Sequence, residues 1–347
     1  MQVLSTNFGN VNDIDVQLFT LKNEAGLEIK LTNYGGIVTS IKTPDKKGVF
    51  QNIVLGFNKL ENYLSKDYLE SYPCFGALIG RFGNRISKGR YSLDGKDYEL
   101  DINHQTNHLH GGFKGFDKNI WKAKIFENKN DVGVELSYLS KDGEGGYPGN
   151  LIVKVNYSLT KNNDFVIEYF ADTDKATPIN LTHHSYFNLS GAGTVLNHEL
   201  RLNSGEFNEV DSELIPTGKM LSVENTPFDF RKMKVIKRDF DRLENGYDNN
   251  YSLNNEEGKF IKAGELYDKN TGRLMEIFTT EVGIQIYTGK FIPILTVEGQ
   301  EKFGSFSGLA LETQHYPDSP NHPNFPNTIL RPGEKYHQRT VYKFSVR

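Results

Sequence analysis

The chain has 347 residues and carries 40 basic and 44 acidic side chains, for a formal net charge of −4. This near balance leaves no electrostatic footprint for nucleic acid or for an anionic membrane surface, and no apolar run reaches membrane-spanning length. The single cysteine, Cys74, excludes an internal disulfide and fits a reducing compartment. With no signal-peptide pattern at the N-terminus, the sequence predicts a soluble, cytoplasmic protein that binds neither nucleic acid nor membrane.

Alternation of apolar and polar residues with a period of two dominates the chain. In the stretch LIVKVNYSLT, Val153, Val155 and Tyr157 share one face, whereas Lys154 and Asn156 share the other. By this pattern, strands are expected at residues 27–32, 37–43, 132–139, 151–160, 164–171, 273–280, 283–288, 307–314 and 341–346.

Helical periodicity is scarce, and only residues 59–70 are expected to form a short helix. Many strands with few helices predict an all-β fold, a large antiparallel β-sandwich. The chain contains no linker, low-complexity tract or short repeat, so residues 1–347 are interpreted as a single domain.

The segment GRFGNRISKGR is the first of five with polar groups that a strand does not require. It holds Arg81 and Arg85 among glycines, which let the backbone approach a ligand closely, and arginine donates hydrogen bonds in a planar fork. The segment lacks the Gly-Lys-Ser/Thr ending of a phosphate-binding loop. Taken by itself, it indicates a solvated basic loop.

The segment NHLHGG places His108 and His110 two residues apart, so in a strand they would share a face. Metal sites in β folds use this spacing, and His183 or His184 with Glu312 could complete a ligand set. No cysteine cluster or HExxH motif supports a metal, and the sequence predicts none.

The segment LTHHSYFNLSG contains the adjacent pair His183 and His184. Neighbouring residues of a strand point to opposite faces, so at most one of the pair can enter a given cavity. An imidazole with its ordinary pKa of about 6.5 can donate or accept a proton near neutral pH. The alternative for each is a packed core histidine.

Three polar residues follow in the second half of the chain. Asp248 lies in the fourth segment, the turn-rich stretch ENGYDNNY, and outside the five segments Gln285 alternates with apolar neighbours in GIQIYTG. Glu312 lies in the fifth segment, GLALETQHYPDSPNHPNFPN, opposite Leu309 and Leu311 in an apolar strand, where a carboxylate is costly to bury unless it is paired or functional. The proline-rich stretch after it must end the strand, and strand ends commonly carry a site.

Six segments in this order resemble the aldose 1-epimerase (galactose mutarotase) family: GRFGNRI, NHLHGG, THHSYFNLSG, GYDNNY, QIYTG and LETQHYPDSPN. The resemblance runs from about residue 25 to the C-terminus, and all six segments in order are specific where each alone is weak. It implies a mutarotase-like supersandwich with a sugar in an open cleft. It also implies interconversion of the α and β anomers of free hexoses such as D-galactose and D-glucose by a monomer or weak homodimer.

The resemblance implies that Glu312 is the general base and His184 the general acid. It implies that the substrate-binding residues are Asn84, Arg85, His110, Asp248 and Gln285. The carboxylate would take the anomeric proton while the imidazolium protonates the ring oxygen, and the opened aldehyde would reclose with inverted configuration. This chemistry requires no metal and no cofactor. We expect Glu312 to be ionised and His184 to be protonated by nearby carboxylate charge.

Two alternatives keep a sugar as the ligand. A relative acting on phosphorylated hexose would need a basic cluster, which Arg81, Lys88 and Arg90 could form. A non-catalytic carbohydrate-binding protein has no need for Glu312 together with His184, so their co-occurrence argues against it.

Two alternatives change the chemistry instead. A metal-dependent β-barrel enzyme would use His108, His110 and His184 as ligands. A two-carboxylate glycosidase would use Asp248 and Glu312 across a scissile bond.

Overall fold

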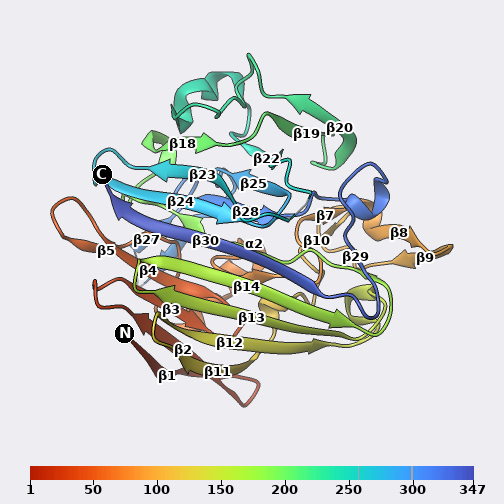
Figure 1. The fold of residues 1–347 in the computed structure, drawn as a ribbon, viewed down its shortest axis with the longest axis horizontal. Helices are drawn as coiled ribbons and strands as arrows, with labels where there is room; N and C mark the ends of the chain where they lie inside the picture. The colour runs from red at the N-terminus through yellow and green to blue at the C-terminus, as the bar shows by residue number, and fades with distance from the viewer. Residues whose placement is uncertain (257, 298–299) are drawn as a thin grey trace.

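The computed structural model describes residues 1–256, 258–297 and 300–347 of the chain. Nearly all of its regular structure is β-strand, arranged in antiparallel sheets (Figure 1). The prediction of an all-β antiparallel fold with few short helices is therefore confirmed. No helix among the described residues is long and apolar enough to cross a membrane.

Three sheets hold most of the strands (Figure 1). The nine-stranded sheet has the order β11 (Lys122–Glu127), β12 (Asp131–Ser140), β13 (Leu151–Thr160), β14 (Asp164–Thr173), β30 (Tyr336–Val346), β24 (Arg273–Thr279), β23 (Ile261–Tyr267), β18 (Glu199–Leu202), β21 (Lys234–Val235). The six-stranded sheet has the order β17 (Tyr186–Phe187), β28 (Leu309–Gln314), β25 (Gly283–Tyr287), β22 (Asp248–Ser252), β19 (Glu206–Val210), β20 (Pro216–Ser222). The five-stranded sheet has the order β1 (Gln2–Val11), β2 (Ile14–Lys22), β3 (Glu28–Thr32), β4 (Val38–Pro44), β5 (Phe50–Asn52).

Short strand pairs and helical turns connect these sheets. The pairs are β7 (Arg85–Ile86) with β10 (His108–Leu109), β6 (Leu78–Ile79) with β16 (Thr182–His183), β15 (Thr177–Pro178) with β29 (Ile329–Leu330), β8 (Arg90–Leu93) with β9 (Lys96–Glu99), and β26 (Leu295–Val297) with β27 (Gln300–Phe303). The α-helices are α1 (Leu60–Tyr63) and α2 (Lys66–Ser71). The 3-10 helices are Ser87–Gly89, Phe116–Lys118, Glu144–Gly146, Val195–Asn197, Ile236–Arg242 and Ser319–Asn321.

The hydrophobic core lies beneath the nine-stranded sheet. On β13, Val153, Val155 and Tyr157 are fully buried while Lys154 is exposed, as the alternation predicts. Burying one such apolar side chain contributes roughly 1.5–3 kcal/mol relative to leaving it in water. The alternation with a period of two therefore determines which face of the sheet is buried.

The structure also contains strands that periodicity does not reveal. β1 and β2 pair along most of their length, yet β1 is largely exposed and lacks an apolar face. An edge strand buries little, so its sequence carries little alternation. The single predicted helix at 59–70 is in fact the two short helices α1 and α2, and Ser65 between them caps α2 by accepting a hydrogen bond from the Tyr68 amide.

The six-stranded sheet positions the polar residues of its central strands. β28 pairs with β25 so that Glu312 lies directly beside Gln285, and β25 pairs with β22 so that Gln285 lies beside Asn250. Residues in register share a face. Every residue of β28 is buried, so Glu312 is enclosed on a strand that is covered on both faces.

Candidate active site

Three neighbouring strands bring Glu312, Gln285 and Asp248 together. Gln285 is the register partner of Glu312, and its Nε2 donates a hydrogen bond of 2.6 Å to Asp248 Oδ1. Asp248 begins β22, opposite Tyr287 of β25. The predicted base and two predicted sugar-binding residues therefore occupy one sheet.

His184 faces Glu312 from a separate segment. Its backbone is fixed by two hydrogen bonds, from its amide to the Ala77 carbonyl (2.9 Å) and from the Gly76 amide to its own carbonyl (3.0 Å). Its Nε2 lies 3.6 Å from Glu312 Oε1, and the two side chains are only 7% and 2% exposed. Its ring packs edge-to-face against His110, with centroids 5.3 Å apart. The predicted acid and base therefore form one buried pair.

Asn84 and Arg85 lie where β7 begins, and His110 directly follows its partner strand β10. The Asn84 amide donates to His110 Nδ1 at 3.1 Å, and the His110 amide donates to the Asn84 carbonyl at 3.2 Å. Because Nδ1 accepts, the network assigns the proton of a neutral His110 to Nε2. Asn84 Oδ1 also accepts from the Arg85 amide at 2.9 Å. Asn84 thus holds both neighbours in place.

The expectation that His108 and His110 share a strand face is wrong. His110 has a left-handed φ of 52°, so β10 ends at Leu109 and the chain turns. His108 is buried, with Nδ1 2.7 Å from the Asp101 carbonyl and Nε2 2.7 Å from the Tyr147 hydroxyl. Both of its ring nitrogens are occupied. Among the described residues, no group of three or more His, Cys, Asp or Glu side chains could hold a metal ion.

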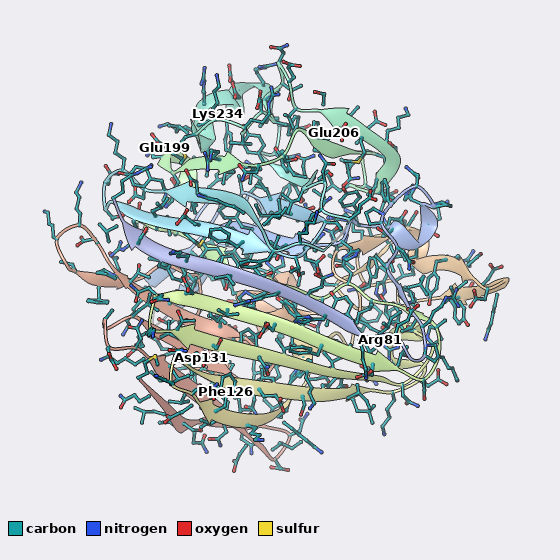
Figure 2. The ribbon with its side chains drawn as sticks, viewed as in Figure 1. Arg81, Phe126, Asp131, Glu199, Glu206 and Lys234 are labelled. Carbon is teal, nitrogen blue, oxygen red and sulfur yellow. The ribbon has the colours of Figure 1, made fainter. Side chains whose placement is uncertain are left out.

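The interpretation of Arg81 as part of a solvated basic loop is also wrong. Arg81 is 2% exposed, and its guanidinium donates to Ser140 Oγ, to the carbonyls of Pro148 and Gly149, and to other groups at the ends of β12 and β13, where Figure 2 labels it. Arg90 pairs with Glu99 at 2.8 Å instead. The basic cluster expected of a hexose-phosphate enzyme does not form from these arginines.

Burial reverses the expected protonation of the acid–base pair. It raises the pKa of Glu312 to about 8, helped by the negative charge of Asp248 and opposed by Arg85. Burial likewise lowers the pKa of His184 to about 4. Near pH 7 the pair therefore rests as a neutral carboxyl and a neutral imidazole, because both charged forms lose their hydration.

His183 points away from this pair. Its ring lies between Tyr157 and Phe165, with centroid distances of 6.0 and 6.1 Å, and it is 2% exposed. Burial lowers its pKa to about 3, so it stays neutral. The prediction that the two histidines of the pair face opposite ways is confirmed.

Asp318 is a residue of the site that the sequence reasoning missed. Its amide donates to the Arg85 carbonyl at 2.8 Å, and its Oδ1 accepts from the Ser87 amide at 2.9 Å, across 231 residues of sequence. Asp318 is 2% exposed and has a left-handed φ of 56°. It clamps the backbone on both sides of Ile86. The motif DSPN, six residues after Glu312, indicates a turn at this position. It does not reveal that Asp318 bonds the backbone of Arg85 and Ser87.

We expect Asp318→Ala to raise KM for galactose by about ten- to a hundredfold, with a smaller fall in kcat, because Arg85 would lose its support while Glu312 and His184 stay in place. Asp318→Asn keeps an oxygen acceptor and should retain most of the affinity. Steady-state polarimetry and a thermal melt measure both. Equal losses from the two variants, or a loss confined to kcat, would contradict this role.

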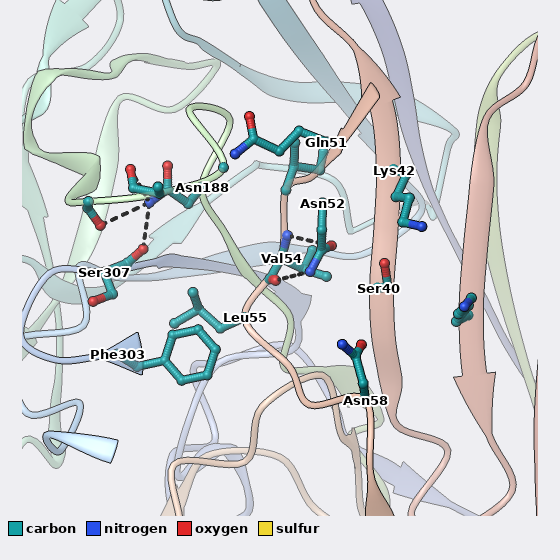
Figure 3. Close-up of a pocket in the computed structure, with 15 residues that line it drawn as sticks. Ser40, Lys42, Gln51, Asn52, Val54, Leu55, Asn58, Asn188, Phe303 and Ser307 are labelled. Atoms are coloured by element: carbon teal, nitrogen blue, oxygen red, sulfur yellow. Dashed lines mark hydrogen bonds between the residues drawn. The ribbon is translucent and has the colours of Figure 1, made fainter. Parts of the chain in front are cut away.

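A cavity of about 710 Å³ lies away from these residues, between β4, β5 and the loops that carry Asn188 and Ser307 (Figure 3). Two of the side-chain amides that line it are already used, since Asn52 bonds the Val54 backbone and Asn188 Nδ2 donates to the Ser307 carbonyl at 2.8 Å. It contains none of the predicted site residues. Despite its size, it offers no acid–base pair.

Comparison with known proteins identifies the family. The aldose 1-epimerase family model matches residues 17–343. The chain is 42% identical to the galactose mutarotase of Bos taurus over 336 residues, which cover 95% of this chain and 94% of that protein. It is 37% identical to the aldose 1-epimerase of Escherichia coli (strain K12) over 337 residues, which cover 94% and 95%.

Solved structures of aldose epimerases also superpose on this chain. The galactose 1-epimerase of Lactobacillus acidophilus NCFM superposes with a TM-score of 0.86 at 26% identity, over 99% of each chain. The aldose epimerase homologue of C. elegans superposes with a TM-score of 0.85 at 30% identity, over 95% of this chain and 98% of that one. The chain belongs to the aldose 1-epimerase family.

Proposed function

We propose that the protein interconverts the α and β anomers of free hexoses such as D-galactose and D-glucose. The carrying observation is the buried pair of Glu312 and His184, 3.6 Å apart. Buried polar atoms beside it lack hydrogen-bond partners in the described structure, namely Glu312 Oε2, His184 Nδ1 and Arg85 Nε. Buried polar groups normally find partners, and the hydroxyls of a sugar would supply them.

In this proposal Glu312 removes the proton of the anomeric hydroxyl while His184 delivers a proton to the ring oxygen. The bond between C1 and the ring oxygen breaks, and the electron pair of the anomeric O–H becomes the aldehyde carbonyl. Rotation about C1–C2 turns the other carbonyl face to the ring hydroxyl. The two residues then exchange roles, and the ring closes with inverted configuration. Each proton transfer of this kind contributes typically 10²- to 10⁴-fold in rate.

The remaining site residues would hold the sugar. Arg85 and His110, both next to Asn84, would bind near the ring oxygen, where Arg85 also stabilises developing charge. Asp248 would accept from hydroxyls across the ring, with Gln285 fixing its carboxylate at 2.6 Å. Burial raises the pKa of Asp248, while Arg85 and the Gln285 hydrogen bond oppose that rise. In this proposal the acceptor Asp248 lies opposite the reacting end of the sugar.

Polarimetry tests the proposal directly. Freshly dissolved α-D-galactose relaxes slowly to its anomeric equilibrium, and the protein is expected to accelerate that relaxation catalytically. A rate equal to that of buffer would contradict the proposal. Three further properties of the protein stay predictions: its organisation as a single domain, its cytoplasmic location and its state as a monomer or weak homodimer.

We expect kcat/KM to be independent of pH between about 4 and about 8. The pKa of His184 is lowered to about 4 and that of Glu312 is raised to about 8, so the pair holds one proton over that range. The ionic form needed for catalysis differs from the neutral form only by a proton moved between the two groups, so its fraction stays constant. The rate should fall below pH 4 and above pH 8. A profile rising steadily from pH 5 to pH 8 would contradict this.

A further inference from the structure

His184 lies where its own segment of chain separates from the strand that carries the base. β17 pairs with β28 through the backbone, with Tyr186 opposite Ala310. Earlier in the chain this pairing is replaced, because β16 pairs with β6. The amide of His184 bonds the Ala77 carbonyl and not β28. The position of His184 relative to Glu312 therefore depends on contacts other than backbone pairing between their strands.

Two side chains take the place of that pairing. Thr182 Oγ1 donates to the Thr313 carbonyl of β28 at 2.9 Å. Asn180 Oδ1 accepts from the His315 amide at 2.9 Å, and Asn180 Nδ2 donates to the His315 carbonyl at 3.2 Å. Thr182 is 1% exposed and Asn180 is 0% exposed. We call these contacts of Thr182 and Asn180 with the backbone of Thr313 and His315 the rungs.

The rungs and the imidazole of His184 lie on one side of their segment. Asn180, Thr182 and His184 all reach β28 or the residue that follows it. Leu181 and His183 alternate with them and face the hydrophobic core. This is the alternation of an extended chain, in which residues two apart point the same way. The Thr182 rung therefore acts on the segment two residues from the acid and beside the residue that follows the base.

Asn180 also bonds the loop that leads to the predicted sugar-binding residues Asn84 and Arg85. Its Nδ2 donates to the Gly83 carbonyl at 3.2 Å, and its backbone carbonyl accepts from the Gly83 amide at 2.7 Å. A buried polar network whose members are all hydrogen-bonded is rigid. One buried amide thus joins the segment of the acid, the end of the strand of the base and a sugar-binding loop.

We propose that Thr182 and Asn180 are positioning residues that hold the imidazole of His184 in place against Glu312. The inference rests on the proposed function, in which these two groups act on the same sugar. A displacement of about 1 Å in such an arrangement can lower the rate roughly 10²-fold. Losing the Thr182 rung should therefore lower kcat, while KM stays nearly unchanged because the sugar-binding residues keep their places.

Thr182→Val tests the first rung, because the methyl group that replaces the hydroxyl cannot bond the Thr313 carbonyl. We expect kcat for galactose to fall about ten- to a hundredfold, with KM within about threefold of the wild-type value. Thr182→Ser keeps the hydroxyl donor and should retain kcat within about threefold. Polarimetry gives both constants, and a thermal melt shows that each variant is folded.

A second measurement shows whether Thr182 acts through His184. In a protein that already carries His184→Ala, Thr182→Val should change kcat by less than about twofold, because the imidazole that the rung positions is absent. A general disturbance of packing would lower kcat by the same factor with and without His184. The remaining rates are measured at high protein concentration, with the relaxation rate in buffer subtracted.

Asn180→Ala removes the second rung together with the bonds of the side chain to Gly83. It should lower kcat and also raise KM, because the loop that leads to Arg85 loses support. A wild-type kcat in this folded variant would contradict the role of Asn180.

Thr39→Val is the matched control for Thr182→Val. Thr39 is also buried, at 2% exposed, and its Oγ1 donates to the Lys30 carbonyl at 3.4 Å within the five-stranded sheet. It is not one of the residues proposed to bind the sugar. Its replacement should leave kcat and KM at their wild-type values.

Four outcomes would overturn the proposal for Thr182: a wild-type kcat in Thr182→Val, an equal loss in Thr182→Ser, an equal loss in the presence of His184→Ala, or an equal loss in Thr39→Val. A wild type that relaxes galactose no faster than buffer contradicts the proposed function itself. An active wild type together with a fully active Thr182→Val contradicts only the positioning role.

Discussion

Replacing Glu312 by glutamine is expected to lower kcat for galactose by about 10³-fold or more, because an amide cannot take the anomeric proton. The substitution keeps the shape of the side chain, so KM should change little. Initial rates of optical rotation measure the effect. Activity within about tenfold of wild type would contradict the assignment of Glu312 as the base.

Glu281→Gln provides a matched control for this loss. Glu281 is 1% exposed and faces a histidine too, with Oε2 2.7 Å from His315 Nδ1, but it is not one of the residues proposed to touch the sugar. Its replacement should cost less than about tenfold in kcat. If both glutamines abolish activity equally, the loss reflects the buried network and not general-base chemistry.

The variant Glu312→Gln should be more stable than the wild type at alkaline pH. The folded-state pKa of Glu312 is about 8 against an ordinary value of 4.5, so the unfolded chain ionises first. The wild type therefore keeps its full free energy of unfolding below about pH 4.5. As the pH rises towards 8, it loses the contribution of Glu312, which is at most about 5 kcal/mol. Urea unfolding should show a clear gain for Glu312→Gln at pH 9 and little at pH 4. A variant less stable at pH 9 would contradict the raised pKa.

Replacing His184 by alanine is expected to lower kcat by about 10² to 10⁴-fold, because the group that delivers the proton to the ring oxygen is lost. His184→Asn, which removes the titrating ring but keeps a polar side chain, should also erase the acid limb of the pH profile near pH 4. Combined with Glu312→Gln, either change should add little, because the two groups act as a unit. An unchanged profile in His184→Asn would remove His184 from the acid role.

His183→Asn is the matched control for His184. The ring of His183 lies against Tyr157 and Phe165 and does not face Glu312, so most of the activity should remain. Comparing the two variants distinguishes a catalytic imidazole from a packed imidazole at the neighbouring position. Comparable losses would mean that the doublet acts through the fold of this segment.

The sequence by itself determined the fold class and the identity of the acid–base candidates. The alternation of Val153, Val155 and Tyr157 set the buried face of β13, because burial on one face of a strand is a local, period-two property. Glu312 and Gln285 stood out for the same reason, as polar residues in apolar strands. The order of the six segments then pointed to a family, which the comparisons confirm.

Only the tertiary structure decided how equivalent-looking residues differ. Arg81 is a buried structural residue while Arg85 lies in the site, and His108 bonds Tyr147 while His110 meets His184. Each of these differences depends on a backbone angle or on a contact with a residue far away in sequence. Neither cause produces a pattern in the local sequence.

The protonation of the pair and the support of Arg85 are non-local in the same way. The pKa of Glu312 rises because several strands together exclude water from it, and Asp318 bonds the Ser87 amide across 231 residues of sequence. Periodicity reports which face of a strand is buried. Desolvation and long-range hydrogen bonds arise only when the sheets have packed, so the sequence named the catalytic candidates while the packed fold decided their charge, their support and the space around them.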